Sequence, residues 1–208
     1  MRLIHIIMSK ATKSTLFIVA ILVLDQALKI WIKTHMTLGQ EFSIIGNWFI
    51  LHFIENNGMA FGMEFAGKTG KLILSIFRVI AVIGIGLYLR HLIKEGAPYG
   101  LVFSISAIFA GAIGNIIDSA FYGIIFTDSG FFQLASIFPE EGGYSSFLHG
   151  RVVDMLYFPV LKGHYPSWFP WNSGGEFIFF RPVFNLADSS ITIGVSSILI
   201  FQKRFFKK

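Results

Sequence analysis

The 208-residue sequence contains no cysteine and few charged side chains. Without cysteine, the chain can form no disulfide bond, no thiolate metal site and no cysteine nucleophile. Charged residues make up 14% of the chain, against about 25% in typical globular proteins. Hydrophobic residues make up 54%, and Phe alone occurs 24 times. A water-soluble protein of this size could not bury so many apolar side chains, so the composition indicates a membrane protein.

Four segments are long and apolar enough to cross the hydrocarbon core of a bilayer, which takes about 20 residues in a helix. We expect these spans at about residues 14–31, 72–89, 99–121 and 187–201. The first span follows a basic N-terminus, as a cleaved signal peptide would. No small-residue cleavage site follows it, however, and a polar helical turn does, so we interpret it as a retained span.

Basic residues in the short segments predict the orientation. They occur before the first span, between the second and third, and after the fourth: Arg2, Lys10, Lys13, Arg90, Lys94, Lys203, Arg204, Lys207 and Lys208. In a four-span protein these segments share one side, so we expect cytoplasmic N- and C-termini. The long segments 33–71 and 122–186 then lie outside, and residues 42–54, rich in Phe and Ile, predict short strands there. The basic residues lie at the ends of the expected helices rather than on one continuous patch. The net charge of +5 therefore does not indicate a nucleic-acid partner.

Ionisable residues within spans are costly and need a structural or functional reason. Asp25 and Lys29 have i, i+4 spacing, which permits either a self-neutralising pair or a group that orients a site. Asn115 and Asp118 lie on a helical stripe with small residues, where they could bond to another helix. Spacing alone leaves these structural roles open.

Two further carboxylates lie at the outer rim. Asp154 is flanked by apolar residues, and Asp188 precedes the fourth span, where it could simply cap a helix. If the two face each other, both cannot readily ionise, and one would hold a proton while the other does not. That arrangement activates water in an aspartyl protease and requires no metal. Chain spacing permits this meeting but does not establish it.

Five motifs occur in an order that resembles the lipoprotein signal peptidases (signal peptidase II). They are Asp25-Gln26 with Lys29, Asn57-Gly58-Met59-Ala60-Phe61-Gly62, Gly114-Asn115-Ile116-Ile117-Asp118, Val152-Val153-Asp154 and Phe184-Asn185-Leu186-Ala187-Asp188. The resemblance implies Asp154 and Asp188 as the catalytic pair. It also implies a supporting set, namely Asp25, Lys29, Asn57, Gly58, Asn115, Asp118 and Asn185.

The same resemblance implies the reaction and its setting. Enzymes of this kind remove the signal peptide of a diacylglyceryl-prolipoprotein, cutting before the lipid-modified cysteine, without a cofactor. The implied fold is a single domain over residues 1–208, with four membrane helices, a small extracytoplasmic β-sheet and a short surface helix or flap. We expect a monomer in the bacterial inner membrane, contacting membrane lipid, with its site at the outer face and sensitive to cyclic peptides of the globomycin type.

Three departures from the family pattern bear on the site. The usual Arg after the Asp118 position is Ser119, and Arg151 or Arg181 could replace it. Met155 stands where Phe is usual. The segments 122–150 and 161–181 are longer than the pattern and could form an extra flap or a partner surface.

Rival interpretations have less support. A small transporter or channel would line a path across the bilayer with polar residues and often shows inverted repeats, and neither is apparent. A membrane scaffold without chemistry would not cleave a precursor. A Ser–Lys dyad is disfavoured because Asp25 would keep Lys29 charged. A zinc peptidase is disfavoured because no His-Glu-x-x-His motif occurs, so we expect no metal.

Overall fold

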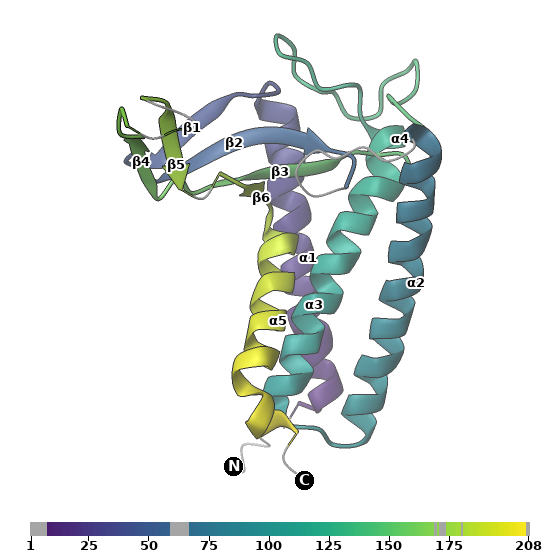
Figure 1. Cartoon of the computed structure of the whole chain (residues 1–208). Helices are drawn as coiled ribbons and strands as arrows, with labels where there is room; N and C mark the ends of the chain where they lie inside the picture. Colours follow the sequence, from purple (N-terminus) through teal and green to yellow (C-terminus); the bar gives the residue numbers. More distant parts are fainter. Residues whose placement is uncertain (1–7, 59–66, 169, 171–173, 180, 207–208) are drawn as a thin grey trace, which may run out of the picture.

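The computed structural model describes residues 8–58, 67–168, 170, 174–179 and 181–206. Long helices run side by side, and a β-sheet lies across one end of them, which we call the sheet end (Figure 1). The long helices are α1 (Lys10–His35), α2 (Gly67–Lys94), α3 (Tyr99–Ile117) and α5 (Leu186–Phe205). α1 begins and α5 ends at the end opposite the sheet, so the chain enters and leaves the bundle on the same side (Figure 1).

Three of the four expected spans coincide with helices of membrane-crossing length and hydropathy. Within the described residues, three stretches are long and apolar enough to cross a membrane: Lys10–His35, Thr69–Lys94 and Tyr99–Ile125. The third continues α3 through a π-helical turn, η2 (Asp118–Tyr122), and a short helix, α4 (Gly123–Ile125). α5 occupies the expected fourth span but does not reach the same length and hydropathy. Its 20 residues rise about 30 Å, the thickness of a hydrocarbon core.

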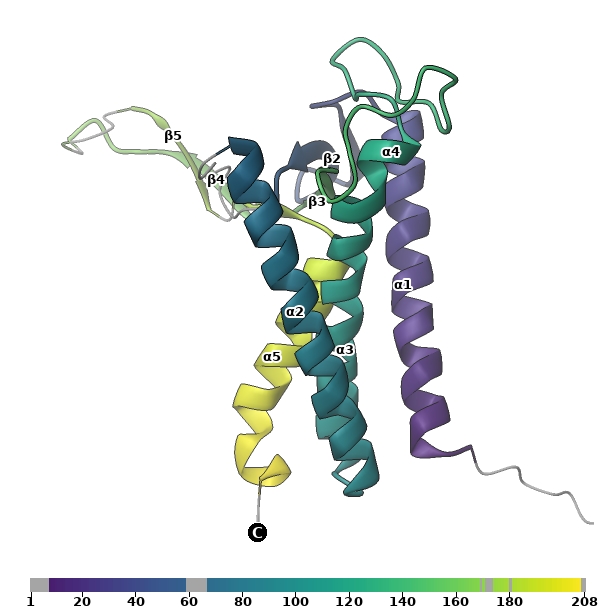
Figure 2. The same ribbon diagram turned by 90° about the vertical axis from the view of Figure 1, so that its right-hand side faces the viewer.

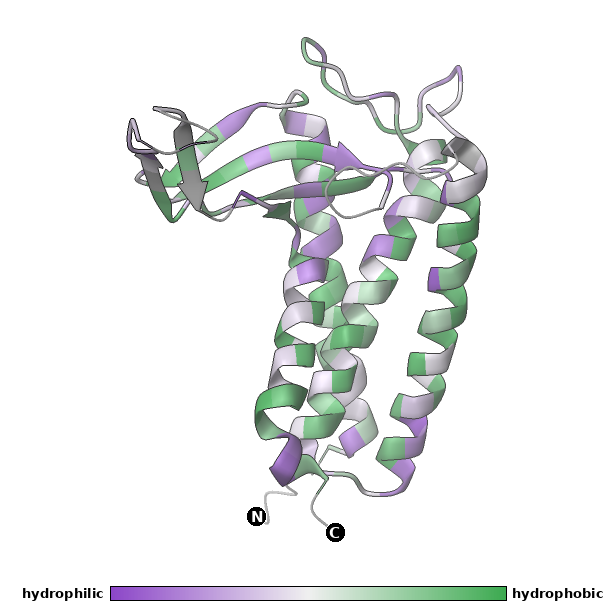
Figure 3. Ribbon diagram, in the orientation of Figure 1, coloured by the Kyte–Doolittle hydropathy of each residue, from purple (hydrophilic) through white to green (hydrophobic). Residues whose placement is uncertain are grey.

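The outer surface of the bundle is apolar. Figure 3 shows hydrophobic residues along most of each long helix. Large side chains such as Leu24, Phe77 and Ile200 are more than 60% exposed. Water would not stabilise so continuous an apolar surface, whereas lipid chains solvate it at no cost. The fold is therefore of the membrane-helical type.

α3 and α5 pack closely because small residues line their contact. A Cβ atom at Gly111 would overlap the carbonyl oxygen of Ala187, and one at Gly194 would lie 2.6 Å from the carbonyl oxygen of Ser104. Ser190 Oγ donates to the carbonyl oxygen of Ala107 at 2.8 Å. Close backbone approach and a side-chain bond across the contact are typical of helix pairs in lipid. The predicted small-residue stripe on the third span is confirmed.

The main sheet is antiparallel, with strand order β1-β2-β3-β6. Its strands are β1 (Glu41–Ile45), β2 (Phe49–Asn56), β3 (Val152–Tyr157) and β6 (Val183–Phe184). β1 and β2 confirm the strands predicted within residues 42–54. β6 is followed almost at once by α5, so the sheet fixes where the last helix begins.

A hydrophobic core joins the sheet to the helices. It includes Ile32 of α1, Met36 at the C-cap of α1, Phe53 of β2 and Met155 of β3, all fully buried. Tyr122 also belongs to it. Met155, which replaces the Phe usual in the resembling family, thus serves as a core side chain. Because the core anchors β2 and β3 directly over the helices, polar side chains of these strands are held in fixed positions at the sheet end.

The two long insertions take different forms. Residues 127–151, which we call the outer loop, rise above the sheet end, whereas residues 161–181 contain a separate hairpin that projects to one side (Figures 1 and 2). This hairpin pairs β4 (Leu161–His164) with β5 (Glu176–Phe179). Within the described residues of these insertions, no separate surface helix occurs, and α4 continues α3. These two insertions therefore form a loop and a hairpin, and the short surface helix or flap stays a prediction.

Ion pairs attach the outer loop to the bundle. The Glu55 carboxylate, at the end of β2, pairs with Lys33 of α1 and with Arg151, whose Nη1 lies 3.2 Å away. Lys33 Nζ also donates to Ser129 Oγ at 2.7 Å. Arg151 pairs further with Asp128. We call Lys33, Glu55, Ser129, Arg151 and Asp128 the loop clamp.

Some predictions fall outside the described residues. These concern Arg2, Met59, Ala60, Phe61, Gly62, Lys207 and Lys208.

Candidate active site

Asp154 and Asp188 lie where β3 meets the start of α5. Asp154 is in β3 and is 4% exposed. Asp188 is in the first turn of α5, whose N-cap is Asn185, an extended residue with φ −118° and ψ 179°. Asn185 Oδ1 accepts from the Asp188 backbone N–H at 2.8 Å. The cap is thus Asn185, and the simple interpretation of Asp188 as a helix cap was wrong.

Two asparagines connect the aspartates through hydrogen bonds. Asn185 Nδ2 donates to Asp154 Oδ1 at 2.7 Å and lies 3.1 Å from Asn115 Oδ1. Asn115 Nδ2 donates to Asp188 Oδ1 at 2.7 Å. Both amides are oriented by these contacts, and each presents a donor to one carboxyl group. The structure therefore brings together four of the predicted site residues, from β3, α3 and the start of α5.

The environment of Asp154 favours its protonated form. Burial, followed by the negative charge of Asp188, raises the pKa of Asp154 to about 7. Hydrogen bonds donated by Asn185 and Asn56, and the charge of Lys29, oppose that rise in pKa. Asp188 is partly exposed. A buried carboxyl group that titrates near neutrality, beside a second carboxyl group, can serve in acid–base chemistry.

A buried ion cluster lies beneath this pair. Lys29 Nζ lies 3.0 Å from Asp25 Oδ2 and 2.8 Å from Asp118 Oδ2, and these three side chains are at most 1% exposed. Lys29 Nζ also donates to Asn115 Oδ1 at 3.0 Å. Lys29 therefore does more than neutralise Asp25. It also fixes the side chain of Asn115, which contacts Asp188.

Asp25 and Asp118 each hold the backbone next to a catalytic candidate. Asp25 Oδ1 accepts from the Ala187 N–H at 2.9 Å, one residue before Asp188. Asp118 Oδ2 accepts from the Val153 N–H at 3.3 Å, one residue before Asp154. The two carboxylates therefore attach both rim segments to the helices, a more specific role than helix association.

Sequence reasoning overlooked Gln26, which joins the two cluster carboxylates. Gln26 Nε2 lies 3.1 Å from Asp25 Oδ2 and 3.0 Å from Asp118 Oδ1. Its Oε1 accepts from the Tyr122 hydroxyl at 3.1 Å. A polar amide beside Asp25, within a membrane helix, was the available signal.

The Asn57-Gly58 motif contributes through a neighbour. The side chain that donates to Asp154 Oδ2 belongs to Asn56, the last residue of β2. The contact described for Asn57 is from Lys71 Nζ, at 3.3 Å from Asn57 Oδ1. The strand register between β2 and β3, which places Asn56 beside Val152, explains why Asn56 reaches the site.

The missing arginine is not supplied by either predicted residue. Arg151 belongs to the loop clamp, and Arg181 is exposed between β5 and β6. The basic side chain near the aspartates is Arg78 of α2, which sequence reasoning did not single out. Its position within the expected second span was a usable signal, because a charge there needs a reason.

Metal ligands do not gather in this part of the chain. Within the described ranges there is no group of three or more His, Asp or Glu side chains that could hold a metal ion. The polar groups at the rim are two carboxyl groups and their amide donors, a set suited to moving protons.

Comparisons with known proteins agree on one family. The model of the family described as Signal peptidase (SPase) II matches residues 17–204. A lipoprotein signal peptidase of Porphyromonas gingivalis is 50% identical over 189 residues, covering 90% of this chain and 81% of the relative. A lipoprotein signal peptidase of Amoebophilus asiaticus is 39% identical over 185 residues, covering 88% and 73%.

A solved structure supports the same conclusion. It is titled as a bacterial membrane enzyme structure obtained by the in meso method at 2.3 Å resolution. Its sequence is 27% identical, the TM-score is 0.58, and the match covers 94% of this chain and 92% of that chain. By family model, sequence identity and fold, the chain belongs to the signal peptidase II family of lipoprotein-processing peptidases.

Proposed function

We propose that this chain is an aspartic endopeptidase that removes the signal peptide from diacylglyceryl-modified prolipoproteins, cutting before the lipid-bearing cysteine. The observation that carries the proposal is the hydrogen-bonded path from Asp154 through Asn185 and Asn115 to Asp188, at the end of an apolar helix bundle. The relatives' name, lipoprotein signal peptidase, supports the substrate class.

The chemistry follows from the difference between the two carboxyl environments. Asp154, buried and with its pKa raised to about 7, holds the shared proton and donates it to the scissile carbonyl oxygen. Asp188, partly exposed, takes a proton from the attacking water. The asparagine amides keep the carboxyl oxygens in place during this exchange. When the tetrahedral diol collapses, Asp188 passes its proton to the leaving amine nitrogen as the C–N bond breaks, and Asp154 takes a proton back from a diol hydroxyl. The pair is then regenerated.

The membrane placement is part of the proposal. We propose four membrane-spanning helices with α5 as the fourth, both termini on the cytoplasmic side, and the sheet end at the outer face of the bacterial inner membrane. The apolar helix surface supports insertion, and the polar rim supports a site at the boundary. The lipid of the substrate then remains in the bilayer while its peptide bond reaches the aspartates. We propose that the chain acts as a monomer, with a single domain over residues 1–208.

A cleavage assay tests the reaction. Purified protein in lipid nanodiscs is mixed with a precursor peptide carrying a diacylglyceryl cysteine, and products are measured by mass spectrometry. Asp154→Asn and Asp188→Asn should each abolish cleavage while still folding and inserting. Glu141→Gln, an exposed change outside the site, is the matched control for replacing one acid by an amide. Full activity in either aspartate variant would refute the assignment.

Two additions to the assay separate the alternatives. Cleavage should persist in excess chelator, because the proposed mechanism needs no metal, and its loss would favour a metallopeptidase. A globomycin-type cyclic peptide should inhibit it. A transporter or a scaffold would cleave nothing under any of these conditions.

A further inference from the structure

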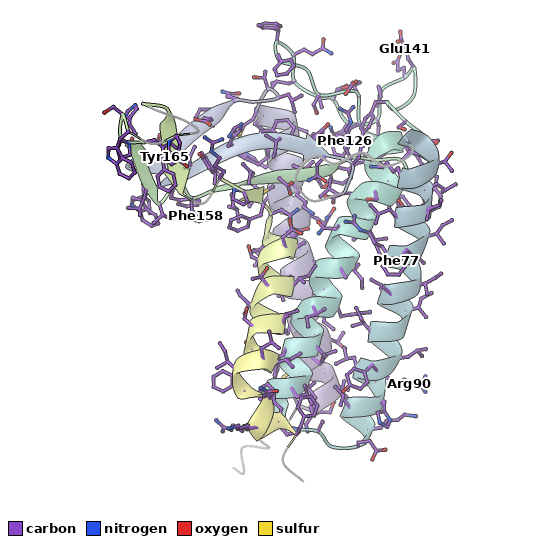
Figure 4. The ribbon with its side chains drawn as sticks, in the orientation of Figure 1. Phe77, Arg90, Phe126, Glu141, Phe158 and Tyr165 are labelled. Carbon is purple, nitrogen blue, oxygen red and sulfur yellow. The ribbon has the colours of Figure 1, made fainter. Side chains whose placement is uncertain are left out.

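Arg78 is a charged residue in the apolar helix α2, on the side of the bundle that carries the proposed active site. The stretch Thr69–Lys94 is apolar enough to cross a membrane, so a guanidinium within it requires a partner. Arg78 is not exposed, in contrast to its neighbour Phe77, which is 65% exposed and is labelled on α2 in Figure 4.

One edge of the guanidinium holds the loop after β2. Arg78 Nη2 donates to the carbonyl oxygen of Gly58. Gly58 has φ +86°, and a Cβ atom there would lie 2.5 Å from Arg78 Nη1. Both the backbone conformation and the space taken by Arg78 therefore require glycine at this position. Gly58 lies two residues after Asn56, which contacts Asp154, so this bond fixes the backbone of Gly58 close to the site.

Within the described part of the chain, the charge of the guanidinium is not neutralised by an ion pair. The carboxylates that influence it are Asp188, then Asp118, then Asp154. None of the ion pairs among the described residues includes Arg78, so no carboxylate there lies within 4.0 Å of it. An arginine has five N–H donors, and the bond to Gly58 uses one of them.

The serine at position 119 bears on the role of Arg78. The family's usual Arg after the Asp118 position is Ser119 here, and Ser119 is 2% exposed, with Oγ donating to the carbonyl oxygen of Asn115. The local cation is absent from η2, and one is present on the neighbouring helix α2.

We propose that Arg78 is a positioning residue of the active site: it fixes the Gly58 loop and supplies, from α2, the positive charge that Ser119 no longer supplies. This inference rests on the proposed function of the aspartate pair. The charged groups that face the site belong to every element around it: Asp25 and Lys29 of α1, Lys71 and Arg78 of α2, Asp118 of η2, Asp154 of β3 and Asp188 of α5. Removing one cation from this set makes ionisation of the pair harder.

The test compares Arg78→Gln and Arg78→Lys with wild type. Arg78→Gln should lower kcat at least about tenfold and move the acid limb of the kcat–pH profile up by about one pH unit, since a nearby charge is lost. Arg78→Lys retains the charge but not the planar fork, so it should restore the acid limb while kcat stays low. The matched control is Arg90→Gln, an exposed site lower on α2 in Figure 4, which should behave as wild type.

A double-mutant comparison tests the contact with the loop. Asn56→Ala should lower kcat because it removes the donor to Asp154, and Asn56→Ala combined with Arg78→Gln should be no less active than the less active of the two single variants. Additive losses would show that the two residues act separately and would overturn the positioning role.

A spectroscopic readout separates this inference from the proposed function. The infrared band of the protonated Asp154 carboxyl group is identified as the band that Asp154→Asn removes. The pH at which half of this band is lost should be higher in Arg78→Gln than in wild type, whether or not any peptide is cleaved. A wild type that cleaves nothing would refute the proposed function alone. The role assigned to Arg78 would be overturned if Arg78→Gln changed neither the midpoint pH of this band nor the acid limb of the kcat–pH profile. This holds even if kcat falls, because misfolding alone would lower kcat without moving either pH value.

Discussion

Asp154→Asn should make the protein more stable at alkaline pH while it removes activity. A carboxyl group whose pKa is higher in the folded state binds its proton more tightly there than in the unfolded chain. Stability is therefore greatest when the group is protonated in both states and falls as pH rises from about 4 to about 7. The wild-type chain carries this cost at Asp154, and an asparagine, which does not ionise, avoids it.

The structure sets the size of the effect. The pKa of Asp154 rises from 3.8 to about 7, and one pKa unit corresponds to about 1.4 kcal/mol, so ionisation costs on the order of 4 kcal/mol at pH 8. At pH 5 the same cost is about 1.6 kcal/mol. Asparagine can accept from only one of the two donors, Asn185 and Asn56, and faces the other with its own N–H groups. That mismatch costs about 1–3 kcal/mol at any pH.

The net result is a crossover. Asp154→Asn should be close to wild type in stability at pH 5 and more stable by about 1–3 kcal/mol at pH 8. For a chain of this size, each kcal/mol moves Tm by about 2–4 °C. The difference in Tm between variant and wild type should therefore grow by about 5–10 °C from pH 5 to pH 8.

Thermal unfolding of both proteins in one detergent, at pH 5, 6, 7 and 8, measures this directly. Asp128→Asn is a suitable control because the side chain of Asp128 is 63% exposed. A Tm difference that stays constant across the series, or that shrinks with rising pH, would refute the reasoning about Asp154. If Asp154→Asn loses cleavage and gains stability, Asp154 is required for the chemistry although it lowers the free energy of unfolding.

Other perturbations test the supporting structure. Lys29→Met should lower the free energy of unfolding by about 3–5 kcal/mol because it leaves buried carboxylates unpaired, and adding Asp118→Asn should recover part of that loss in denaturant titrations. Gly111→Ala should lower Tm by separating α3 from α5, at about 1–3 kcal/mol, whereas Gly84→Ala, with open space around it, should not. Glu55→Gln should weaken the loop clamp, and limited proteolysis should then cut the outer loop faster than in wild type; an unchanged rate would contradict the clamp.

Much of the fold follows from local signals in the sequence. Apolar runs predicted where the helices lie, because length and hydropathy in a span depend on neighbouring residues only. The strands within 42–54 were predicted for the same reason. The β4–β5 hairpin and the outer loop were expected only as insertions, since their form depends on contacts such as those of Lys33 with Glu55, far along the chain.

The site was predicted less evenly. Motif order indicated Asp154, Asp188 and the residues under them, and the structure brings those together. It could not indicate that Asn56, the residue before the Asn57-Gly58 motif, contacts Asp154, because this depends on the register of β2 against β3. The cap at Asn185 depends similarly on backbone angles that no spacing specifies. Arg78 required knowledge of which helix lies beside the rim.

The hydrogen bond between Asp25 and the backbone of Ala187 has a consequence for biogenesis. It joins residues 162 positions apart, near opposite ends of the described chain. Asp25 is therefore synthesised well before Ala187 and its neighbour Asp188. The proposed catalytic pair cannot assemble until α5 has been delivered to the membrane. We expect a nascent chain that still lacks α5 to cleave no precursor at the insertion site.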